Sequence, residues 1–438
     1  MPCSIADSFF EYLAAIDKFF WSYIGFVILF ASGLYLTIKT RGFQFKVLFN
    51  FRACIRELLH NPSKCSSRGI HPIRLYFSSV SGMVGLGNVV GIITAVTYGG
   101  PGALLWLWLA NFPSMLVKYS EIYLGIRYRV PNDRGGYDGG PMYYLRKAFK
   151  SPSVPILASL LLCIYGVEVF QFDVVSDVIA TTLNLNKILV IGGLLAAVLY
   201  TVAGGIRRLS QVCSWLMPFF IVLYVSMCLY IIIHCSHALP GILKMVVHSA
   251  FSGQATTGGF VGSAAMLAAQ QGISRSVYSG DIGIGYDSII QAETRALLPQ
   301  QQARLGIFSL LTDALICTLS ILVVLVTNVW TSRVPPDQFV AKALALYFPH
   351  ADWFMALFLF LAGFTTIVAY LSVGLKSATF LKGKTGRVLY LTYAISAFIF
   401  FSFFDQEKAL LMMSVSAGIL VVLNIMGILR LTKFIRFR

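Results

Sequence analysis

Long apolar stretches separated by short polar segments repeat along the whole chain. About 20 apolar residues suffice for a helix to cross the hydrocarbon core of a bilayer. The pattern predicts an all-α polytopic membrane protein with eleven membrane-spanning helices. They are expected at residues 20–38, 75–98, 102–127, 154–182, 187–204, 210–234, 255–276, 305–330, 351–375, 387–404 and 408–430.

Composition supports the same class. Hydrophobic residues make up 57% of the chain and charged residues 12%, whereas a soluble domain carries about 25% charged residues. The net charge of +16 alone would be compatible with a nucleic-acid partner. Because the basic residues alternate with apolar stretches, we expect the lipid bilayer, and no nucleic acid, to be the partner.

The distribution of lysine and arginine predicts the orientation. Between the predicted spans, 27 basic residues lie in the loop after the first span and in every second segment from there, and six lie in the others. Basic residues are enriched in cytoplasmic loops. We therefore expect a plasma-membrane protein of the bacterial inner-membrane type, with the N-terminus outside and the C-terminus in the cytoplasm.

Two amphipathic segments lie outside the predicted spans. The segment 41–60, "RGFQFKVLFNFRACIRELLH", mixes apolar and basic residues as a helix lying on the inner leaflet does. The outer segment 334–348, "VPPDQFVAKALALYF", is predicted to form a short surface helix after its prolines.

Two glycine-rich runs interrupt apolar spans: "SGMVGLGNVVG" at 81–91 and "GQATTGGFVGSAA" at 253–265. Each run is explained either by close helix packing or by a broken helix that holds a substrate and ions. Without the first span, the runs occupy the first and sixth positions of ten spans. This favours an inverted repeat of five plus five helices with paired broken helices. The runs "GLGNVVG" and "GDIGIG" (280–285) are not phosphate loops, because no strand precedes them.

This arrangement divides the chain into six parts. They are an extra N-terminal helix (1–40), a basic cytoplasmic segment (41–74), a first five-helix repeat (75–235), an outer loop (236–254), a second repeat (255–430) and a basic cytoplasmic tail (431–438).

Several stretches resemble the alanine/glycine:cation symporter family, which includes the sodium:alanine symporters. They are "YGGPGALLWLWLANFPSMLVKYSEIYLGIRYR" (98–129), "GGPMYY" (139–144), "RSVYSGDIGIGYDS" (275–288) and "FTTIVAY" (364–370). The resemblance implies a LeuT-like fold with one extra N-terminal helix. The chain departs from the family pattern at Leu86, Leu105, Leu107 and Asp281, and at the acidic residues Glu168, Asp173 and Asp177 of the third core helix.

A zwitterionic amino acid needs partners for its carboxylate and its ammonium group. The backbone N–H groups of Gly85, Leu86 and Gly87 suit the carboxylate. The resemblance assigns carbonyls for the ammonium group and one aromatic wall to Gly258, Gly259, Phe260 and Gly262. Gln171 and Asp173 lie deepest in the third core helix. Asp173 either meets the ammonium group or forms a structural hydrogen bond.

A sodium site is implied by the spacing of Ala362, Thr365 and Thr366, which matches that of LeuT-like transporters. Carbonyl groups of Ser81 and Val84 would complete five oxygen ligands. Alternatively, both threonines only bond to their own helix turn. Asn88 either orients the broken helix or contacts a second ion. Lys118 and Glu121, three residues apart, are predicted to pair with each other. The roles of Asp281 and Asp313 stay open.

These features predict a Na⁺-coupled symporter that imports alanine or glycine by alternating access. Na⁺ is the coupling ion, and no other cofactor is expected. Proton-coupled transport or exchange through Glu168 or Asp173 is the rival within transport. A channel would need a carbonyl filter or a ring of charges, and an enzyme a clustered catalytic set; the sequence shows neither. It does not indicate the oligomeric state.

Overall fold

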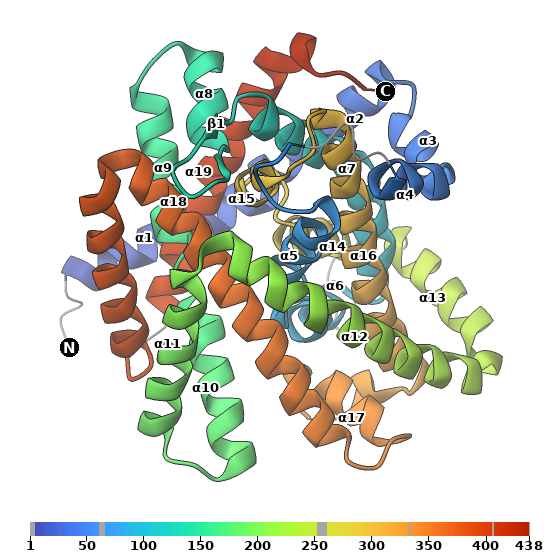
Figure 1. The fold of residues 1–438 in the computed structure, drawn as a ribbon. Helices are drawn as coiled ribbons and strands as arrows, with labels where there is room; N and C mark the ends of the chain where they lie inside the picture. Colours follow the sequence, from blue (N-terminus) through green and yellow to red (C-terminus); the bar gives the residue numbers. More distant parts are fainter. Residues whose placement is uncertain (1–4, 61–65, 252–260, 333, 405–406, 438) are drawn as a thin grey trace.

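Residues 5–60, 66–251, 261–332, 334–404 and 407–437 are described by the computed structural model, and most of them are helical (Figure 1). A helix satisfies its backbone hydrogen bonds within one segment, as a bilayer requires. Two short strands, β1 (Val130–Pro131) and β2 (Tyr137–Asp138), form an antiparallel hairpin. The predicted all-α class is therefore confirmed for the described residues.

The first predicted span, 20–38, is the second half of a longer helix. The helix α1 (Ile5–Phe19), the π-helical segment η1 (Phe20–Gly25) and α2 (Phe26–Lys39) follow one another without a gap. The segment 41–60 forms two helices, α3 (Phe43–Phe49) and α4 (Phe51–His60), where one was expected. Asn50 lies between them, and its side-chain amide donates to the carbonyl of Lys46. Such a local bond competes with helix continuation.

The predicted first repeat contains nine helical elements. They are α5 (Pro72–Met83), η3 (Gly87–Gly91), α6 (Ile92–Gly99), α7 (Ala103–Arg127), α8 (Pro141–Phe149), α9 (Ser153–Tyr165), α10 (Val169–Leu183), α11 (Lys187–Ala203) and α12 (Gly205–His234). The predicted span 154–182 is interrupted at residues 166–168, between α9 and α10.

His71 caps the start of α5. Its Nδ1 accepts a hydrogen bond from the N–H of Ile73 at 3.3 Å. Burial, together with the charges of Arg295 and Arg74, lowers the pKa of His71. The ring is therefore neutral at pH 7 and keeps a nitrogen that can accept.

The remaining elements follow in chain order. They are η4 (Ser236–Ala238), α13 (Leu239–Phe251), α14 (Val261–Gly280), α15 (Tyr286–Ile290), η5 (Gln291–Glu293), α16 (Pro299–Val326), η6 (Val329–Thr331), η7 (Pro336–Gln338), α17 (Phe339–Ala345), α18 (Ala351–Phe401), α19 (Glu407–Leu431) and η8 (Thr432–Phe434). The two predicted spans 351–375 and 387–404 are joined in α18, which is kinked at Lys382 and Gly383.

Three sequence expectations outside the core have different outcomes. The short helix predicted within 334–348 is confirmed by η7 and α17. The segment 236–254 was expected to be a loop, but α13 occupies most of it because Ile242, Val246 and Ala250 form a buried stripe at helical spacing. Arg275 was one of the 27 basic residues expected on the cytoplasmic side between spans, but it lies within α14 and donates to Thr94 of α6 at 2.8 Å.

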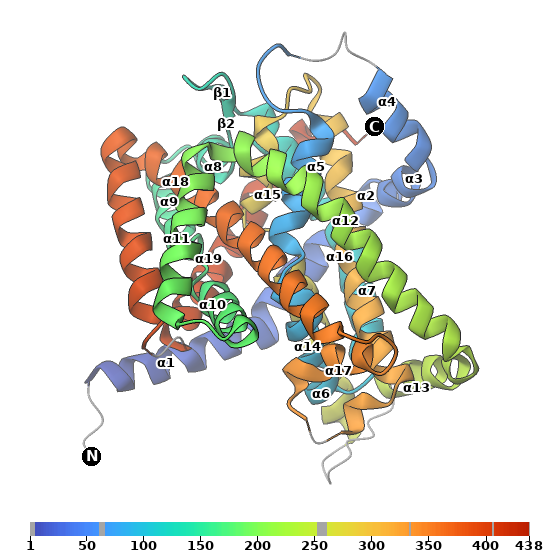
Figure 2. The ribbon, with the colours of Figure 1, turned by 60° about the horizontal axis from the view of Figure 1, so that its bottom comes forward.

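Six helices among the described residues are long and apolar enough to cross a membrane, and seven if α5 with η3 and α6 counts as one bent span. The count of eleven spans and the inverted repeat remain predictions. In Figures 1 and 2, α5 and α15 lie near the middle of the bundle. The C-terminal segment ends beside α3, where the rings of Phe437 and Phe43 are in contact.

Candidate functional site

The helix that contains "SGMVGLGNVVG" is broken at its glycines, as predicted. The helix α5 ends at Met83, η3 begins at Gly87, and the two sides are bent by 52°. We call residues 84–86 the first break. The N–H of Gly85 donates to the carbonyl of Met83 at 3.1 Å and to Oδ1 of Asn88 at 3.2 Å. The second contact fits the role of Asn88 in orienting the unwound segment.

The glycine run 253–265 lies mostly outside the described residues. Gly258, Gly259 and Phe260, assigned to the substrate slot, are among the residues that the structure does not describe. Gly262 lies in α14, which is helical from Val261. An interruption of the seventh span at Gly262 is therefore not observed.

Another interruption, which was not predicted, lies beyond the predicted seventh span, at residues 281–285 between α14 and α15. We call this the second break; it lies in the "GDIGIG" run, which was not predicted to interrupt a helix. The angle φ is +46° at Asp281, +77° at Gly283 and +109° at Gly285. Glycine adopts such angles without a steric penalty, so the alternating glycines could have indicated this break.

Asp313 of α16 connects the two breaks. It accepts a hydrogen bond from Nδ2 of Asn88 at 2.6 Å and one from Oγ of Ser279 at 2.9 Å. Asn88 follows the first break and Ser279 precedes the second. All three side chains are buried. Asp313 is therefore part of the site between the two breaks, and the contribution of Ser279 was missed.

Lys118 and Glu121 do not pair with each other, contrary to the prediction. Lys118 forms a buried ion pair with Asp287 at 2.6 Å and donates to the carbonyls of Gly280 and Asp281 at 2.7 and 3.0 Å. Glu121 accepts from the N–H of Gly283 at 3.1 Å. Each of these two side chains instead bonds to the unwound backbone: Lys118 to carbonyl groups and Glu121 to an N–H group. Both groups therefore stabilise the second break.

The side chain of Asp281 is also fully engaged. It accepts hydrogen bonds from the hydroxyl groups of Tyr165, at 2.8 Å, and of Tyr370. These tyrosines lie on α9 and α18, and their rings are in edge contact. The second break is thereby fixed to two helices besides α7.

The candidate sodium ligands of α5 and α18 lie next to one another. Oγ1 of Thr366 is 2.9 Å from the carbonyl oxygen of Ser81 and 2.9 Å from that of Ala362. Oγ1 of Thr365 is 3.0 Å from the same Ala362 oxygen, and its other partner is also on its own helix. Val84, buried, is the first residue of the first break. Thr366 therefore contacts a carbonyl of α5 as well as one of its own helix turn, and hydrogen bonding within its own turn does not explain the contact with α5.

Gln171 of α10 lies against the first break. A Cβ built on Gly85 would be 3.1 Å from Oε1 of Gln171 and 3.1 Å from Oγ1 of Thr366. Nε2 of Gln171 donates to Glu168 at 3.4 Å, whereas its Oε1 is buried without a hydrogen-bond partner in the described part of the chain. An unsatisfied buried acceptor is rare and costs about 1–3 kcal/mol, which is consistent with a ligand contact.

Asp173, expected to meet either an ammonium group or a broken helix, forms an ion pair with Lys187 at 2.9 Å. Lys187 also pairs with Asp177 at 2.7 Å. Lys187 begins α11, directly after the turn that follows α10, so all three groups gather at one end of this helix pair. Glu168, at the interruption between α9 and α10, is the acidic residue of this segment that lies beside Gln171.

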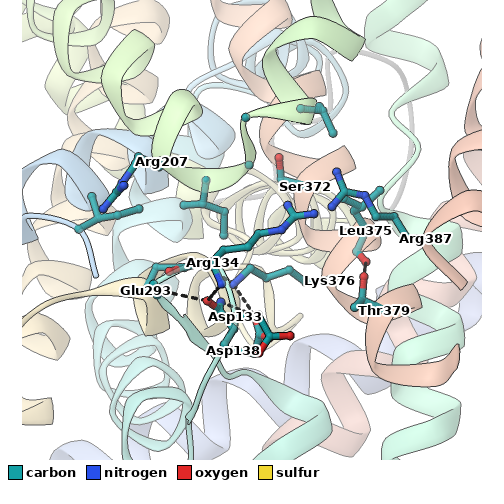
Figure 3. Close-up of a pocket in the computed structure, with 18 of the residues that line it drawn as sticks. Asp133, Arg134, Asp138, Arg207, Glu293, Ser372, Leu375, Lys376, Thr379 and Arg387 are labelled. Carbon is teal, nitrogen blue, oxygen red and sulfur yellow. Dashed lines mark hydrogen bonds and ion pairs between the residues drawn. The ribbon is translucent and has the colours of Figure 1, made fainter. Parts of the chain in front are cut away.

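A cavity of about 670 Å³ opens on the side of the bundle predicted to face the cytoplasm (Figure 3). We call it the basic cavity. Its lining comes from the segment before α5, the hairpin β1–β2, the junction of α11 and α12, Glu293 and the part of α18 on both sides of its kink. Its basic residues are Arg134, Arg207, Lys376, Lys384 and Arg387, and its acidic residues are Asp133, Asp138 and Glu293.

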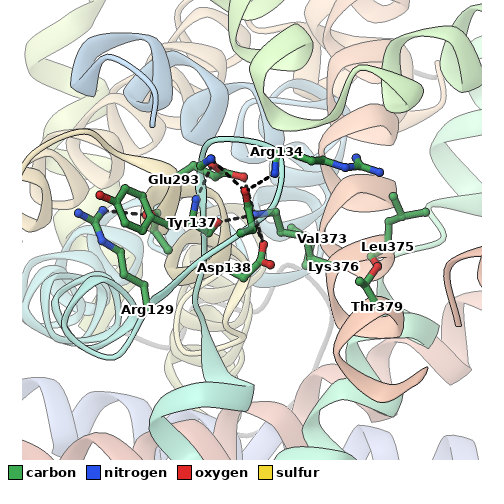
Figure 4. A network of polar contacts seen from close by, with 12 residues as sticks. Arg129, Arg134, Tyr137, Asp138, Glu293, Val373, Leu375, Lys376 and Thr379 are labelled. Atoms are coloured by element: carbon green, nitrogen blue, oxygen red, sulfur yellow. Dashed lines mark hydrogen bonds and ion pairs between the residues drawn. The ribbon is translucent and has the colours of Figure 1, made fainter. Parts of the chain in front are cut away.

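Lys376 of α18 connects three parts of this cavity wall (Figure 4). Its Nζ is 2.8 Å from the carbonyl of Tyr137, 2.8 Å from Oδ1 of Asp138 and 2.6 Å from Oε1 of Glu293. Glu293 also accepts from the N–H of Tyr137 at 3.1 Å. The segments that lead into α5 and out of η5 are joined nearby, because the N–H of Ile70 donates to the carbonyl of Glu293. Both broken helices are thus tied together at this end.

Comparison with known proteins decides the family. The model of the sodium:alanine symporter family matches residues 6–437. The chain belongs to the sodium:alanine symporter family. Among its relatives in that family are an uncharacterized transporter, YflA, and a probable sodium/glutamine symporter, GlnT, both of Bacillus subtilis. They are 28% and 27% identical, cover 96% and 97% of this chain, and are themselves covered over 91% and 89%.

The sodium/alanine symporter AgcS of Methanococcus maripaludis is 25% identical over 97% of this chain and 95% of its own. Among solved structures, MhsT in complex with L-phenylalanine aligns with a TM-score of 0.54 and 15% identity, over 82% of this chain and 89% of that one. That likeness supports the LeuT-like fold alone. As a member of the sodium:alanine symporter family, the chain is a multi-pass secondary transporter, a cation-coupled amino-acid symporter and not an enzyme.

Proposed function

We propose that the chain imports a small neutral amino acid, alanine or glycine, together with Na⁺, by alternating access around the two breaks. The observation that carries this proposal is the contact of Thr366 with Ser81. It brings oxygen atoms of α18 and α5 together at the point where the first helix unwinds. Na⁺ is a hard cation that is coordinated by several oxygens, and unwound backbone in a bilayer supplies them.

In this proposal Na⁺ is held by carbonyl oxygens of Ser81, Val84 and Ala362 and by the hydroxyl oxygens of Thr365 and Thr366. When Na⁺ binds, each threonine hydroxyl directs its lone pairs at the ion while its O–H still donates a hydrogen bond to a backbone carbonyl. The energy suffices for accumulation. A tenfold Na⁺ gradient supplies about 1.4 kcal/mol and 100 mV about 2.3 kcal/mol, so one Na⁺ supports roughly 500-fold accumulation.

The substrate carboxylate is placed on the backbone N–H groups of Leu86 and Gly87. These groups begin the helix η3–α6, and no acceptor in the described residues is paired with them. The first N–H groups of a helix favour an anion. Gly87 is exposed, and a Cβ there would meet nothing within 4 Å beyond its own helix, so a ligand has access.

The ammonium group is placed beside Gln171 and Glu168. The unpartnered Oε1 of Gln171 offers it an acceptor, and Glu168 offers a negative charge. Asp173 is not assigned to the substrate here, because Lys187 already neutralises it. Residues 258–262 would form the remaining wall of the slot, as the family resemblance implies.

Two buried carboxylates, those of Glu168 and Asp313, support alternative proposals for the coupling ion. Glu168 contacts no cationic side chain in the part of the chain that the structure describes, which favours proton coupling through it as the second candidate function. Asp313, held by Asn88 and Ser279, would face a second cation if Asn88 has its other proposed role.

Uptake of radiolabelled alanine, glycine and glutamine into proteoliposomes tests the proposal. We expect alanine or glycine uptake with external Na⁺ and none with choline, whether or not a pH gradient is present. Uptake in choline that follows an imposed pH gradient would establish the proton-coupled alternative. Na⁺-driven glutamine uptake without alanine or glycine uptake would show that the proposed substrate class is wrong.

A further inference from the structure

The basic cavity contains cations that the lysine network does not neutralise. Lys376 is paired with Asp138 and Glu293. Arg134, Arg207, Lys384 and Arg387 form no ion pair with any carboxylate in the described residues. Of the carboxylates that line the cavity, those of Asp138 and Glu293 contact Lys376 and that of Asp133 does not. The hollow therefore gathers an excess of positive charge, which is unfavourable without an anion.

Two helix starts face the same hollow. The 30-residue helix α12 begins at Gly205, which follows Gly204 and has no side-chain cap. The helix α18 is interrupted at Lys382 and Gly383, so its second half begins at Lys384. Gly204, Gly205, Gly383 and Lys384 all line the cavity. The first N–H groups of both helices carry partial positive charge and lack partners within the helix.

Arg134 brings a full positive charge to one of these helix starts. Its Nη1 lies 3.8 Å from the position that a Cβ on Gly205 would take. Its side chain extends from the hairpin toward α18 (Figures 3 and 4), where Arg387 lines the same cavity. Arg208, by contrast, is already occupied, since it donates to the carbonyl of Tyr200 and stacks on that ring. Arg134 thus places a positive charge beside the start of α12 and in the same cavity as Arg387, an arrangement that favours an anion between them.

We propose that the basic cavity binds a phosphate group, held by Arg134, Arg207, Lys384 and Arg387 and by the N–H groups at the starts of α12 and of the second half of α18. Phosphate oxygens accept from guanidinium groups and from helix N-termini in this way. The volume of about 670 Å³ is sufficient for a phosphate with part of its parent molecule. Two sources share this chemistry: the headgroup of an anionic phospholipid and a free phosphate.

A bound phosphate would bridge the hairpin, α12 and α18, all of which line the cavity. It would therefore stabilise the folded protein, with a free energy that rises with the logarithm of the ligand concentration above Kd. This site is distinct from the two breaks, so it does not depend on the proposed substrate or ion.

Thermal unfolding in nanodiscs tests the inference. One arm titrates inorganic phosphate against chloride at equal ionic strength in phosphatidylcholine discs, and the other compares phosphatidylglycerol with phosphatidylcholine discs without phosphate. We expect the wild type to unfold at a higher temperature in at least one arm. A shift with phosphate assigns the free anion, and a shift with phosphatidylglycerol assigns the lipid headgroup. No shift in either arm overturns the proposal.

The variant Arg134→Gln/Arg387→Gln should lose the shift, with roughly tenfold weaker apparent binding for each guanidinium removed. The matched control Arg146→Gln/Lys147→Gln removes two exposed charges of α8 outside the cavity and should keep the shift. Equal shifts in variant and control would mean general charge screening and overturn the site. If the glutamine variant does not fold, Arg134→Lys/Arg387→Lys, which keeps the charge but loses the fork of donors, should show a reduced shift.

Discussion

Replacing Gly87 by alanine tests whether this glycine leaves room for a ligand or for a neighbouring part of the protein. A Cβ on Gly87 would meet no atom within 4 Å beyond its own helix, and its φ is not positive. Alanine can therefore adopt the same backbone without displacing a neighbour. Because alanine favours a helix over glycine by about 1 kcal/mol, the unfolding temperature should be unchanged or higher.

Substrate binding should respond in the opposite direction. If the carboxylate lies on the N–H groups of Leu86 and Gly87, the added methyl group occupies its approach. Loss of one hydrogen bond to a charged group corresponds to about 1.5–3 kcal/mol, or a Kd for alanine raised roughly 10- to 150-fold. Ethylamine, which lacks the carboxylate, should bind neither the wild type nor the variant.

Two control variants complete the experiment, with unfolding temperature and equilibrium binding of radiolabelled alanine measured on each. A Cβ on Gly82 would overlap the hydroxyl of Tyr286, so Gly82→Ala should lower the unfolding temperature. Gly241 is exposed in α13 with nothing within 4 Å, so Gly241→Ala should leave the unfolding temperature unchanged or higher, as for Gly87→Ala, but should not change alanine binding. If Gly87→Ala binds alanine as tightly as the wild type, the carboxylate does not lie at η3.

Three further variants test other parts of the structure. Thr366→Ala should raise the Na⁺ concentration for half-maximal uptake by about tenfold. Thr365→Ala should raise it by less, since both hydrogen-bond partners of Thr365 are on its own helix. An unchanged Na⁺ dependence of uptake in both variants would refute the sodium site. Lys376→Met should leave the carboxylates of Asp138 and Glu293 without a counter-charge, which should lower the unfolding temperature and increase proteolytic cleavage of the hairpin. The control Lys342→Met, at an exposed position, should do neither. Equal behaviour of the two variants would show that the contacts of Lys376 do not hold this end closed. Lys118→Met should destabilise the protein by about 3–5 kcal/mol, because its fully buried carboxylate partner loses its counter-charge, and an unchanged unfolding temperature would contradict that pairing.

The sequence predicted the elements that depend on local pattern. Apolar length predicted the long apolar helices, although not the interruption of 154–182 or the joining of two predicted spans in α18. The glycines of residues 81–91 predicted the first break, because a broken helix in lipid needs residues that allow close approach. The interruption predicted within residues 253–265 stays a prediction, because most of that run lies outside the described residues, and the second break at residues 281–285 was not predicted. A glycine pattern does not indicate which side chains will bond to the unwound backbone, and here Lys118 and Glu121 from α7 do so at residues 281–285.

The charged residues were the least predictable for a physical reason. Within one helix, the i,i+3 spacing of Lys118 and Glu121 suggested a pair, but spacing contains no information about other helices. In a bilayer every unwound N–H and C=O must be satisfied, and that requirement outweighs a local ion pair. Asp173 shows the same limitation, since its partner Lys187 comes from the next helix.

The partners of the buried carboxylates also indicate which of them are available to bind the substrate or a coupling ion. A carboxylate in a low-dielectric interior must be neutralised or well bonded. Asp173 is paired with Lys187 and Asp281 is bonded by two tyrosines, whereas Glu168 accepts from Gln171 and forms no ion pair in the described residues. Asp313 accepts from Asn88 and Ser279 beside the first break, where a second cation is proposed. Glu168→Gln should therefore weaken alanine binding, Asp313→Asn should change the Na⁺ dependence of uptake, and Asp281→Asn should chiefly lower the unfolding temperature. Binding, uptake and unfolding measured on all three variants check this separation; if Asp281→Asn alone weakens alanine binding, the substrate lies at the second break rather than the first.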